Sequence, residues 1–540
     1  MFWPIGAVAQ QTVDPGRVDE RLRPEMPVPR AGAADIPDIT TRETAPAEAL
    51  EVTLTAVIFE GATVVPADVL DSIAAPYLHR PIPLSEVFRL AEEVTAEYRR
   101  RGFVLSRAVV GPQRIENGVL TVHVVEGFID QTRIEGEAGG YRPYLESYLV
   151  PLGEEVTTGS ELSRALLLAQ DLRGASVRAI LTPSADTIGA ADLSLVVARR
   201  PVQAFVALDN RGSRWLGPLQ IYGGLTLNDL LGGAESLSIT GVATPRGDGR
   251  LRYVAGGYDQ PIGGSGLLAS AFASYTHTRP GDELRALGVV GESVTGGLML
   301  QYPFLRSREA NLFGRLGFTG RNSRSSNFAI DPLFRDRTRT VTGELIANRA
   351  TGWGANIETR LSLTRGLDIL GATVAGDSAK SRATGSGEFT RINAETTWVQ
   401  SLAGGLHVLF GAAAQWTPDS LLAAEEFGIG GTQFGRGFDP SEITGDKGFA
   451  GKAELFFTSP APGVGVAEPY VYYEGGRVQQ NDPLPGEQPR TSLQSAGGGV
   501  RMNIHGWLAA SLEYSKPIGR DVAARGNRDG RMFVSLSATY

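Results

Sequence analysis

The pattern of apolar and polar residues divides the chain into two parts at about residue 200. Before this point, apolar residues recur at helical spacing in several segments that alternate with short extended segments. After it, no helical period returns, and apolar positions alternate with small, polar or charged positions to the last residue. The pattern therefore predicts α+β modules followed by a long all-β region.

The first predicted module covers residues 51–128. We expect a strand over residues 54–59, helices over 66–74 and 84–101, and strands over 105–110 and 119–125, with a turn at residues 116–118. Ser85 is expected to cap the longer helix and Gly102 to end it. The helix places five apolar residues on one face: Val87, Leu90, Ala91, Val94 and Tyr98.

The second predicted module covers residues 129–200 and repeats this order after about 75 residues, which indicates an internal repeat. We expect a strand over 131–135, helices over 142–149 and 160–172, and strands over 176–182 and 192–198. Two small modules in tandem suit a binding arm better than a catalytic core. A pair of unrelated α+β domains would show the same order, so this alternative stays open.

Residues 201–540 carry the alternating pattern. Met532, Val534 and Leu536 face one way, and Phe533 and Ser535 face the other. An antiparallel transmembrane β-barrel shows this pattern, because its outer face meets lipid and its lumen is wet. Membrane strands of ~9 to 11 residues plus loops would allow about 16 strands here. A soluble all-β fold also alternates, although its polar face would lie mostly outside.

Composition excludes several classes of function. The formal net charge of −8 and the pI near 5.4 disfavour nucleic acid as a partner, because phosphate binding needs a basic surface. The chain has no cysteine and only five histidines, without an HExxH pairing, so we expect no metal and no cofactor. The chain contains no run of 18 consecutive apolar residues, so no membrane-spanning helix is predicted.

Residues 1–50 read as a leader and a linker. MFWPIGAVAQQ ends like a signal-peptidase site but lacks a basic start, so we expect a clipped signal peptide or a start codon placed too late, with a disordered tail as the alternative. Residues 10–49 form a proline-rich linker in which only residues 17–22, after Asp14-Pro15-Gly16, could make a short helix.

The segment GIGGTQFGRGF at residues 428–438 is rich in glycine and carries one arginine. Gly435 and Gly437 allow close approach to a wall, and Arg436 offers a planar fork of donors suited to a carboxylate. A solvated turn is the alternative. A phosphate loop is excluded, because Arg436 and Gly437 stand where lysine and a hydroxyl residue are required, and no nucleotide is expected.

Several motifs together resemble one family, the outer-membrane transporters of two-partner secretion, or haemolysin and filamentous-haemagglutinin secretion/activation proteins. The two modules resemble its polypeptide-transport-associated (POTRA) domains. The similar segments are GFVLSRAVVGPQ at 102–113, VVEG at 124–127, SELSRALLLAQDLRG at 160–174, DNRGSRWLG at 209–217, FGRGF at 434–438 and YYEGG at 472–476.

The resemblance implies a latch inside the barrel. In this family the arginine of FGRGF lies on a long loop folded into the lumen, here near residues 428–450, and pairs with an acid on the wall. Arg436 and Glu474 occupy those places, although the family usually has aspartate at the second. The rest of the two motifs comprises Phe434, Gly435, Gly437, Phe438, Tyr472 and Gly476.

The resemblance also implies the function: a pore, not an enzyme, that exports a large β-rich exoprotein from the periplasm to the surface of a Gram-negative cell. Residues 17–22 would correspond to a helix that plugs the resting pore. The other expected partners are outer-membrane lipid and the barrel assembly machinery, which would recognise the terminal aromatic Tyr540. A monomer is expected.

The modules would hold the exoprotein by strand addition. The candidate contact residues are Leu105, Ser106, Arg107, Ala108 and Val109 in the first module and Ser176, Val177 and Arg178 in the second. Ordinary pairing within each module is the alternative reading for these residues. A barrel-assembly factor of the same superfamily remains the alternative function, although such factors usually carry more than two modules.

Overall fold

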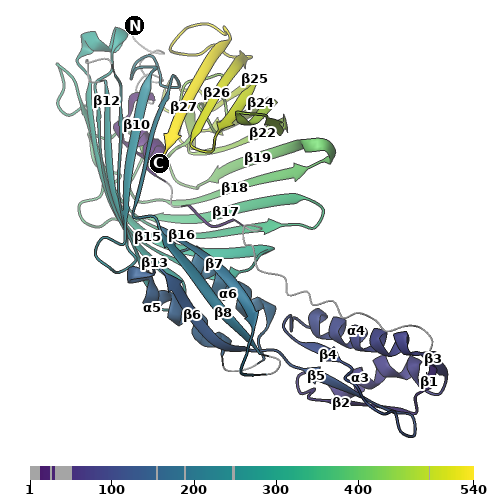
Figure 1. The fold of residues 1–540 in the computed structure, drawn as a ribbon. Helices are drawn as coiled ribbons and strands as arrows, with labels where there is room; N and C mark the ends of the chain where they lie inside the picture. The colour runs from purple at the N-terminus through teal and green to yellow at the C-terminus, as the bar shows by residue number, and fades with distance from the viewer. Residues whose placement is uncertain are drawn as a thin grey trace. The chain divides into compact units, whose positions relative to one another are not determined.

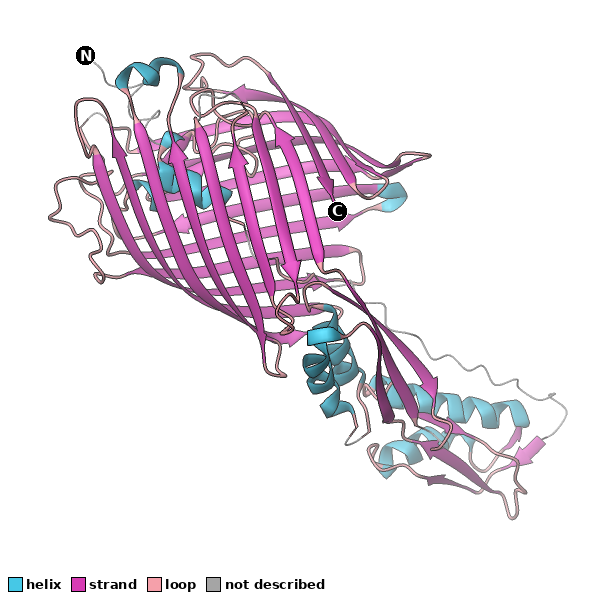
Figure 2. Ribbon diagram, turned by 60° about the vertical axis from the view of Figure 1, so that its left-hand side comes forward, coloured by secondary structure: helices cyan, strands magenta, loops and turns pink. Residues whose placement is uncertain are grey.

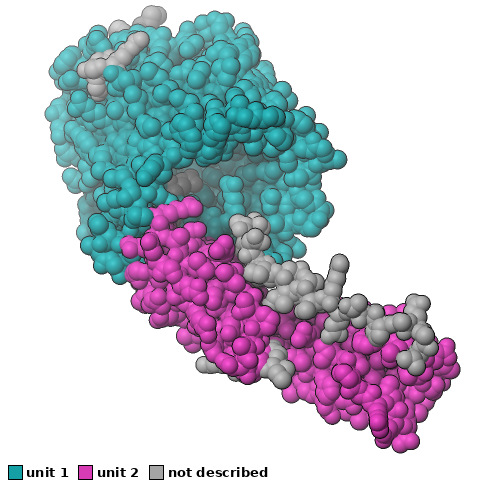
Figure 3. Space-filling model, in the orientation of Figure 1, with its two compact units in different colours: residues 1–32, 201–262, 266–540 teal, residues 33–200, 263–265 magenta. Residues whose placement is uncertain are grey.

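The computed structural model describes residues 12–24, 27–30, 51–153, 156–187, 190–245, 250–485 and 487–540. The expected leader, residues 1–11, lies outside the described residues, as does most of the linker. The chain divides into two compact units (Figure 3). One comprises Met1–Gly32, Pro201–Ile262 and Gly266–Tyr540, and the other comprises Ala33–Arg200 and Gly263–Ser265. No helix among the described residues is long and apolar enough to cross a membrane.

The first half of the second unit is an α+β module around a three-stranded sheet of order β2-β5-β4, in which β2 runs parallel to β5. The predicted first strand over 54–59 corresponds to β2; the short strands β1, which precedes it, and β3, which pairs with β1, were not predicted. The elements are β1 (Glu51–Thr53), β2 (Ala56–Glu60), α3 (Ala67–Ala74), η1 (Ala75–Tyr77), β3 (Pro81–Pro83), α4 (Leu84–Arg100), β4 (Arg107–Val109) and β5 (Val119–Val125).

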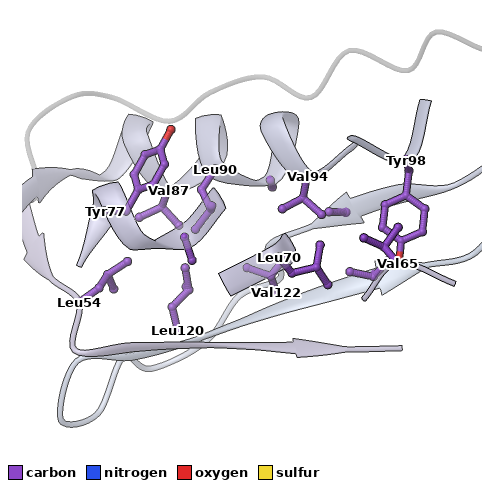
Figure 4. Packing of buried hydrophobic residues seen from close by; sticks show 14 of the residues in the cluster. Leu54, Val65, Leu70, Tyr77, Val87, Leu90, Val94, Tyr98, Leu120 and Val122 are labelled. Carbon is purple, nitrogen blue, oxygen red and sulfur yellow. The ribbon is translucent and has the colours of Figure 1, made fainter. Parts of the chain in front are cut away.

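Helix α4 buries its apolar face against this sheet. All five residues predicted for that face are buried. The expectation that Ser85 caps the helix is wrong, because the helix starts at Leu84, and Pro83, two residues before Ser85, lies at the cap position without a side-chain cap. Gly102 ends it with a positive φ of 92°. Figure 4 shows the packed side chains, among them Leu54, Leu70, Val87, Leu90, Val94, Tyr98, Leu120 and Val122.

The second half repeats the topology, with sheet order β6-β8-β7 and β6 parallel to β8. Thr158 and Glu161 form a capping box at the start of α6. The elements are β6 (Ile129–Gly136), η2 (Gly139–Tyr141), α5 (Arg142–Leu149), η3 (Val150–Leu152), α6 (Gly159–Gln170), β7 (Ala175–Pro183) and β8 (Ala191–Arg199).

The first unit is a closed antiparallel barrel (Figures 1 and 2). Segments β22 and β23 both pair with β24 and are separated only by Thr458, so they form one strand and the barrel has 16, as predicted. The strands up to the long lumen loop are β9 (Val202–Asp209), β10 (Gln220–Asn228), β11 (Ser236–Ala243), β12 (Leu251–Ile262), β13 (Leu267–Thr278), β14 (Val290–Arg306), β15 (Ala310–Ser326), β16 (Phe334–Ala350), β17 (Ala355–Gly366), β18 (Thr390–Ser401) and β19 (Leu406–Trp416).

The strands after that loop close the barrel by pairing β27 with β9. They are β22 (Lys447–Phe457), β23 (Ser459–Ala461), β24 (Gly465–Gln479), β25 (Arg490–Ile504), β26 (Leu508–Ile518) and β27 (Arg531–Thr539). Short 3₁₀ turns occur at η4 (Asp282–Leu287) and η5 (Ala403–Gly405).

The barrel wall separates an apolar outside from a polar inside. On β27, Met532 and Val534 are 52% and 45% exposed, whereas Phe533 between them is 3% exposed. On β26, Glu513 and Ser515 are buried while their neighbours Leu512 and Tyr514 are exposed. This is the arrangement expected when lipid covers the outer face and polar groups line the lumen.

Candidate functional site

A long loop, residues 417–446, connects β19 to β22, and we call it the latch loop. It contains η6 (Ala423–Glu425) and a small hairpin of β20 (Phe427–Ile429) and β21 (Ile443–Gly445). Phe438 is fully buried, and Phe434 packs against the same apolar cluster. The cluster joins the loop to the wall through Ile429, Phe438, Ile443, Ala450, Val478, Leu493 and Val522. The loop is therefore a packed part of the lumen.

Arg436 at the tip of this loop is surrounded by three wall carboxylates. Its Nε lies 3.2 Å from Glu474 on β24, and its Nη1 lies 3.0 Å from Glu454 on β22 and 3.3 Å from Glu513 on β26. The backbone N–H of Arg436 also donates to Glu474. Arg436 is 9% exposed and Glu474 1%. The predicted pair is thus brought together, within a larger cluster.

Sequence reasoning missed Glu454 and Glu513. Both lie on lumen-facing positions of alternating strands, which is the signal that could have found them. Two further arginines balance the extra negative charge: Arg211 lies 3.0 Å from Glu513, and Arg501 pairs with Glu454. The cluster contains three arginines and three glutamates. Burying such charges is tolerable because each one faces an opposite charge.

Two tyrosines of β24, Tyr470 and Tyr472, lie beside the guanidinium of Arg436. The Arg436 guanidinium lies 3.4 Å from the ring centroid of Tyr472, a cation–π contact. The Tyr472 hydroxyl donates to Ser515 over 2.6 Å, and the Tyr470 hydroxyl donates to Glu513 over 2.7 Å. Tyr472, which the wall motif predicted, therefore fixes the plane of the arginine fork.

Glycines are needed where the latch loop meets the wall. A Cβ at Gly437 would lie 3.0 Å from the backbone nitrogen of Pro517 and 3.1 Å from Ser495. A Cβ at Gly476 would lie 2.6 Å from Ile429 of the loop and 2.9 Å from Ala450. Gly435 has a φ of 84°, which disfavours any side chain. These positions let the loop approach the strands closely enough for Arg436 to reach its partners.

A short helix, α2 (Pro15–Leu22), lies inside the barrel against β13, β14, β15 and η6, and Figure 2 shows it within the barrel wall. Asp14 caps it by accepting from the backbone N–H groups of Gly16 and Arg17, and Pro15 fills the first turn. The Asp14-Pro15 pair thus explains why a helix starts here. Val18 packs in an apolar cluster with Trp215 and Tyr253 of the barrel unit.

Polar groups fix helix α2 on its other sides. Asp19 accepts hydrogen bonds from Ser274, Thr276 and Thr295 of the wall. Arg17 lies 3.1 Å from Glu426 of the latch loop. Wall Arg321 contacts both α2 and the latch loop, through Glu20 at 3.4 Å and Glu425 at 3.2 Å.

The described part of the linker also lies in the barrel. Asn348 on β16 donates its side-chain amide to the carbonyl of Pro29 over 3.0 Å. A chain segment that follows helix α2 therefore runs along the inner wall.

The candidate contact residues of the second module, and Arg107, Ala108 and Val109 of the first, lie on edge strands, whereas Leu105 and Ser106 precede β4, which is shorter than the predicted strand over 105–110. Among the described residues, β4 pairs only with β5, and β7 pairs only with β8. Arg107, Ser176 and Arg178 are exposed. Ser106, Ala108 and Val177 are buried in the modules, and Leu105 and Val109 are half-buried. Ser106 accepts a hydrogen bond from the Gly127 N–H, so its side chain serves the module itself.

Tyr540 exposes its side chain, while its backbone exchanges hydrogen bonds with Ala204 on β9. Within the described ranges, no group of three or more histidine, aspartate or glutamate side chains is placed to hold a metal ion. The charged side chains around Arg436 are paired with one another, so the site is an ion-pair network.

Comparison with known proteins gives consistent matches over most of the chain. Residues 189–502 match the family model for haemolysin secretion/activation protein ShlB/FhaC/HecB, and residues 52–127 match the POTRA domain, ShlB-type. The chain is 21% identical over 482 residues to the heme/hemopexin transporter protein HuxB of Haemophilus influenzae, covering 88% of this chain and 84% of HuxB.

Two matches concern a second relative. The chain is 24% identical over 442 residues to the outer membrane transporter CdiB of Escherichia coli, covering 80% of this chain and 74% of that protein. A solved structure of CdiB from Escherichia coli superposes with a TM-score of 0.73 at 22% identity and covers 93% of both chains. This structural likeness concerns the fold.

Proposed function

This chain belongs to the haemolysin secretion/activation protein family ShlB/FhaC/HecB, and we propose from this premise that helix α2 closes its barrel at rest and the latch loop shapes the path. The protein is an outer-membrane transporter of two-partner secretion, which exports an exoprotein from the periplasm to the cell surface. Its POTRA domains are periplasmic. The members of the family are transporters, and we extend this to the absence of enzymatic activity here.

The observation that carries the latch proposal is the position of Arg436 among Glu454, Glu474 and Glu513. An arginine fork fixes geometry more strongly than a single point charge does. Its partners come from three different strands, so the loop tip is held from several directions. We propose that this arrangement keeps the lumen ordered while an unfolded polypeptide passes, and that no nucleotide drives the process.

We propose that the plug is a second, separable element. Beside the apolar contacts of Val18, helix α2 is bound through side-chain hydrogen bonds and ion pairs, such as Asp19 with Ser274 and Arg17 with Glu426. Polar contacts of this kind exchange with water more readily than a packed apolar face does. The helix is therefore suited to leave the lumen when the exoprotein enters.

The modules are proposed to capture the exoprotein by adding its strand to β4 or β7. Exposed Arg107 and Arg178 would contact its side chains, while the buried residues of the two strands would contribute backbone groups only. Exposed Ile180 on β7 offers an apolar contact. Such contacts are weak individually, which suits a substrate that must move on. A β-rich exoprotein fits this mode, because its strands pair along an edge.

The remaining proposed partners are those expected of a β-barrel in the outer membrane. We propose that lipid covers the exposed apolar face, that the assembly machinery recognises the exposed ring of Tyr540, and that the transporter acts as a monomer. The family match favours secretion over the alternative of a barrel-assembly factor.

The test is export of the cognate exoprotein, whose gene is to be sought next to that of the transporter. Cells that carry both genes should present the exoprotein at the surface, and cells that carry a transporter without residues 51–200 should retain it in the periplasm. Surface exposure of the exoprotein in cells without the transporter would overturn the proposal. Efficient export by the shortened transporter would overturn the role of the modules.

A further inference from the structure

The barrel closes at a short ladder. Strands β9 and β27 pair from Ser535↔Asp209 to Thr539↔Phe205, which is five residue pairs, and Tyr540 exchanges backbone hydrogen bonds with Ala204. On its other side, β9 pairs with β10 over eight residue pairs. The periplasmic end of β9 is Val202, so the first residues of β27, 531–534, extend past the end of β9 on the side toward the cell surface.

Asn210 extends this ladder with its side chain. Its amide Nδ2 donates to the carbonyl of Met532 over 3.0 Å, and its Oδ1 accepts from the N–H of Val534 over 2.8 Å. Its own backbone N–H donates to the Val534 carbonyl over 3.3 Å. The side-chain amide thus replaces a peptide group of β9 at the point where the strand leaves the sheet.

Arg211 binds strands β26 and β27 from inside the lumen. Its Nη2 donates to Glu513 of β26 over 3.0 Å, and its guanidinium lies 4.5 Å from the ring centroid of Phe533 on β27. Its backbone N–H donates to Asp209 over 2.9 Å, which holds the turn. Asn210 and Arg211 therefore join the first strand of the barrel to its last two strands.

Glu513 and Phe533, the two residues that the Arg211 side chain contacts, are each linked to the latch loop through a second arginine. Glu513 also accepts from Nη1 of Arg436 over 3.3 Å. Phe533 has a second cation near its ring, Arg531 at 4.9 Å, and Arg531 lies 2.8 Å from Asp439 of the latch loop. Two short routes of contacts thus connect the seam to the loop.

We propose that Asn210 and Arg211 form a clasp that holds the barrel seam closed, and that Glu513 and Phe533 couple this clasp to the latch loop. Movement of the latch loop then loosens the seam. The coupling rests on the proposed function, in which the latch loop shapes the export path, and it adds that the loop moves during transport. The clasp itself does not depend on transport.

The test uses the absence of cysteine from the chain. Ala207 and Ser537 face each other across the seam, and Ala207→Cys with Ser537→Cys gives one thiol pair. The oxidised fraction of this pair in a glutathione redox buffer reports the effective concentration of the two thiols. Thr342→Cys with Thr364→Cys, a lumen-facing pair on β16 and β17, is the matched control.

We expect Asn210→Ala with Arg211→Ala to lower the effective concentration several-fold at the seam and to leave the control pair unchanged. Arg436→Ala, which removes a residue outside the seam, should lower it in the same direction. Asn210→Asp should give an intermediate value, because it keeps the acceptor for Val534 and loses the donor to Met532. This conservative variant serves if the double variant does not insert.

An unchanged seam pair in the clasp variants would overturn the clasp. A seam pair that responds to the clasp variants and not to Arg436→Ala would overturn the coupling. An equal loss at the control pair would show general destabilisation and would also overturn the clasp. The measurement uses purified full-length barrel without exoprotein, so a failure of export leaves its result intact.

Discussion

Arg17 on helix α2 lies 3.1 Å from Glu426 of the latch loop, 409 residues further along the chain. Both side chains are buried, and Glu426 also lies 3.5 Å from Arg382, which pairs with Asp446 at the end of the loop. The plug and the latch are therefore parts of one ionic network. Displacement of helix α2 removes Arg17 from Glu426 and leaves Arg382 beside it.

Arg17→Ala should open the pore more often without unfolding the barrel. The lost charge-assisted hydrogen bond is worth about 1.5–3 kcal/mol, and Arg382 remains to neutralise Glu426. Single-channel recording should show a higher open probability. Arg324→Ala removes an exposed ion pair with Asp331 and should change nothing, since such pairs contribute roughly 0–1 kcal/mol. Equal open probability in Arg17→Ala and wild type would contradict the proposal that the ion pair between Arg17 and Glu426 keeps the pore closed.

Arg436→Ala should impair export far more than Glu474→Ala. Removal of the arginine leaves buried Glu474 without its arginine partner, beside Glu454 and Glu513, which keep only Arg501 and Arg211, whereas removal of Glu474 leaves Arg436 with Glu454 and Glu513. We expect a loss of at least about tenfold for the first and a few-fold for the second, since tenfold corresponds to about 1.4 kcal/mol. Quantitative blotting of surface exoprotein measures both.

Exchange of the two residues, Arg436→Glu with Glu474→Arg, should not restore export. A glutamate at position 436 would face Glu454 and Glu513, so the exchange creates a like-charge contact. Restoration would mean that Arg436 and Glu474 act as an isolated pair.

Gly476→Ala should displace the latch loop. The added methyl would collide with Ile429 of the loop and with the backbone of Ala450. A Cβ at Gly343 on β16 would meet nothing within 4 Å, so Gly343→Ala is the matched control. Protease accessibility of the loop in the folded barrel should rise in Gly476→Ala only. Equal protection in both variants would mean that the loop does not depend on close approach to the wall.

Glu126→Gln should destabilise the first module and make its stability depend less on pH in the acid range. Burial opposes ionisation of Glu126, but hydrogen bonds from Thr63, Val64 and Tyr98 outweigh it and hold its pKa below the ordinary value. A lowered folded-state pKa contributes stability above the unfolded pKa of about 4.3, and this contribution is lost as the pH falls through the folded pKa.

Thermal unfolding of residues 51–200, followed by circular dichroism, measures this effect. At pH 7 we expect a loss of about 1–2 kcal/mol in Glu126→Gln, and a smaller difference from wild type below pH of about 4. The exposed Glu92→Gln is the control. A difference that grows toward low pH would contradict the assigned direction.

The sequence predicted the alternating strands and both modules because one-sided burial leaves a direct pattern. Met532 and Val534 are lipid-facing by their period alone. The latch pair was predictable only through motif resemblance, since no period brings Arg436 beside Glu474. Glu454 and Glu513 were missed because a lumen carboxylate looks like any polar wall residue until the loop is placed over it.

Two other features were predicted only in part. The start of α4 at Leu84 agrees with the expected start, but the cap position is Pro83, without a side-chain cap, and not Ser85. Helix α2 has only eight residues, which is too short to be stable alone, and its contacts with the lumen stabilise it. Its buried position therefore follows from tertiary contacts such as those of Asp19, and local propensity predicts only its start.

The central claim is a pore closed by helix α2, and planar-bilayer conductance of the full-length protein beside a form without residues 12–24 tests it most directly. The account predicts a full-length channel that is mostly closed, with brief openings, and a shortened form with larger and steadier conductance. Equal conductance and equal gating in the two forms would contradict the claim that this helix closes the pore.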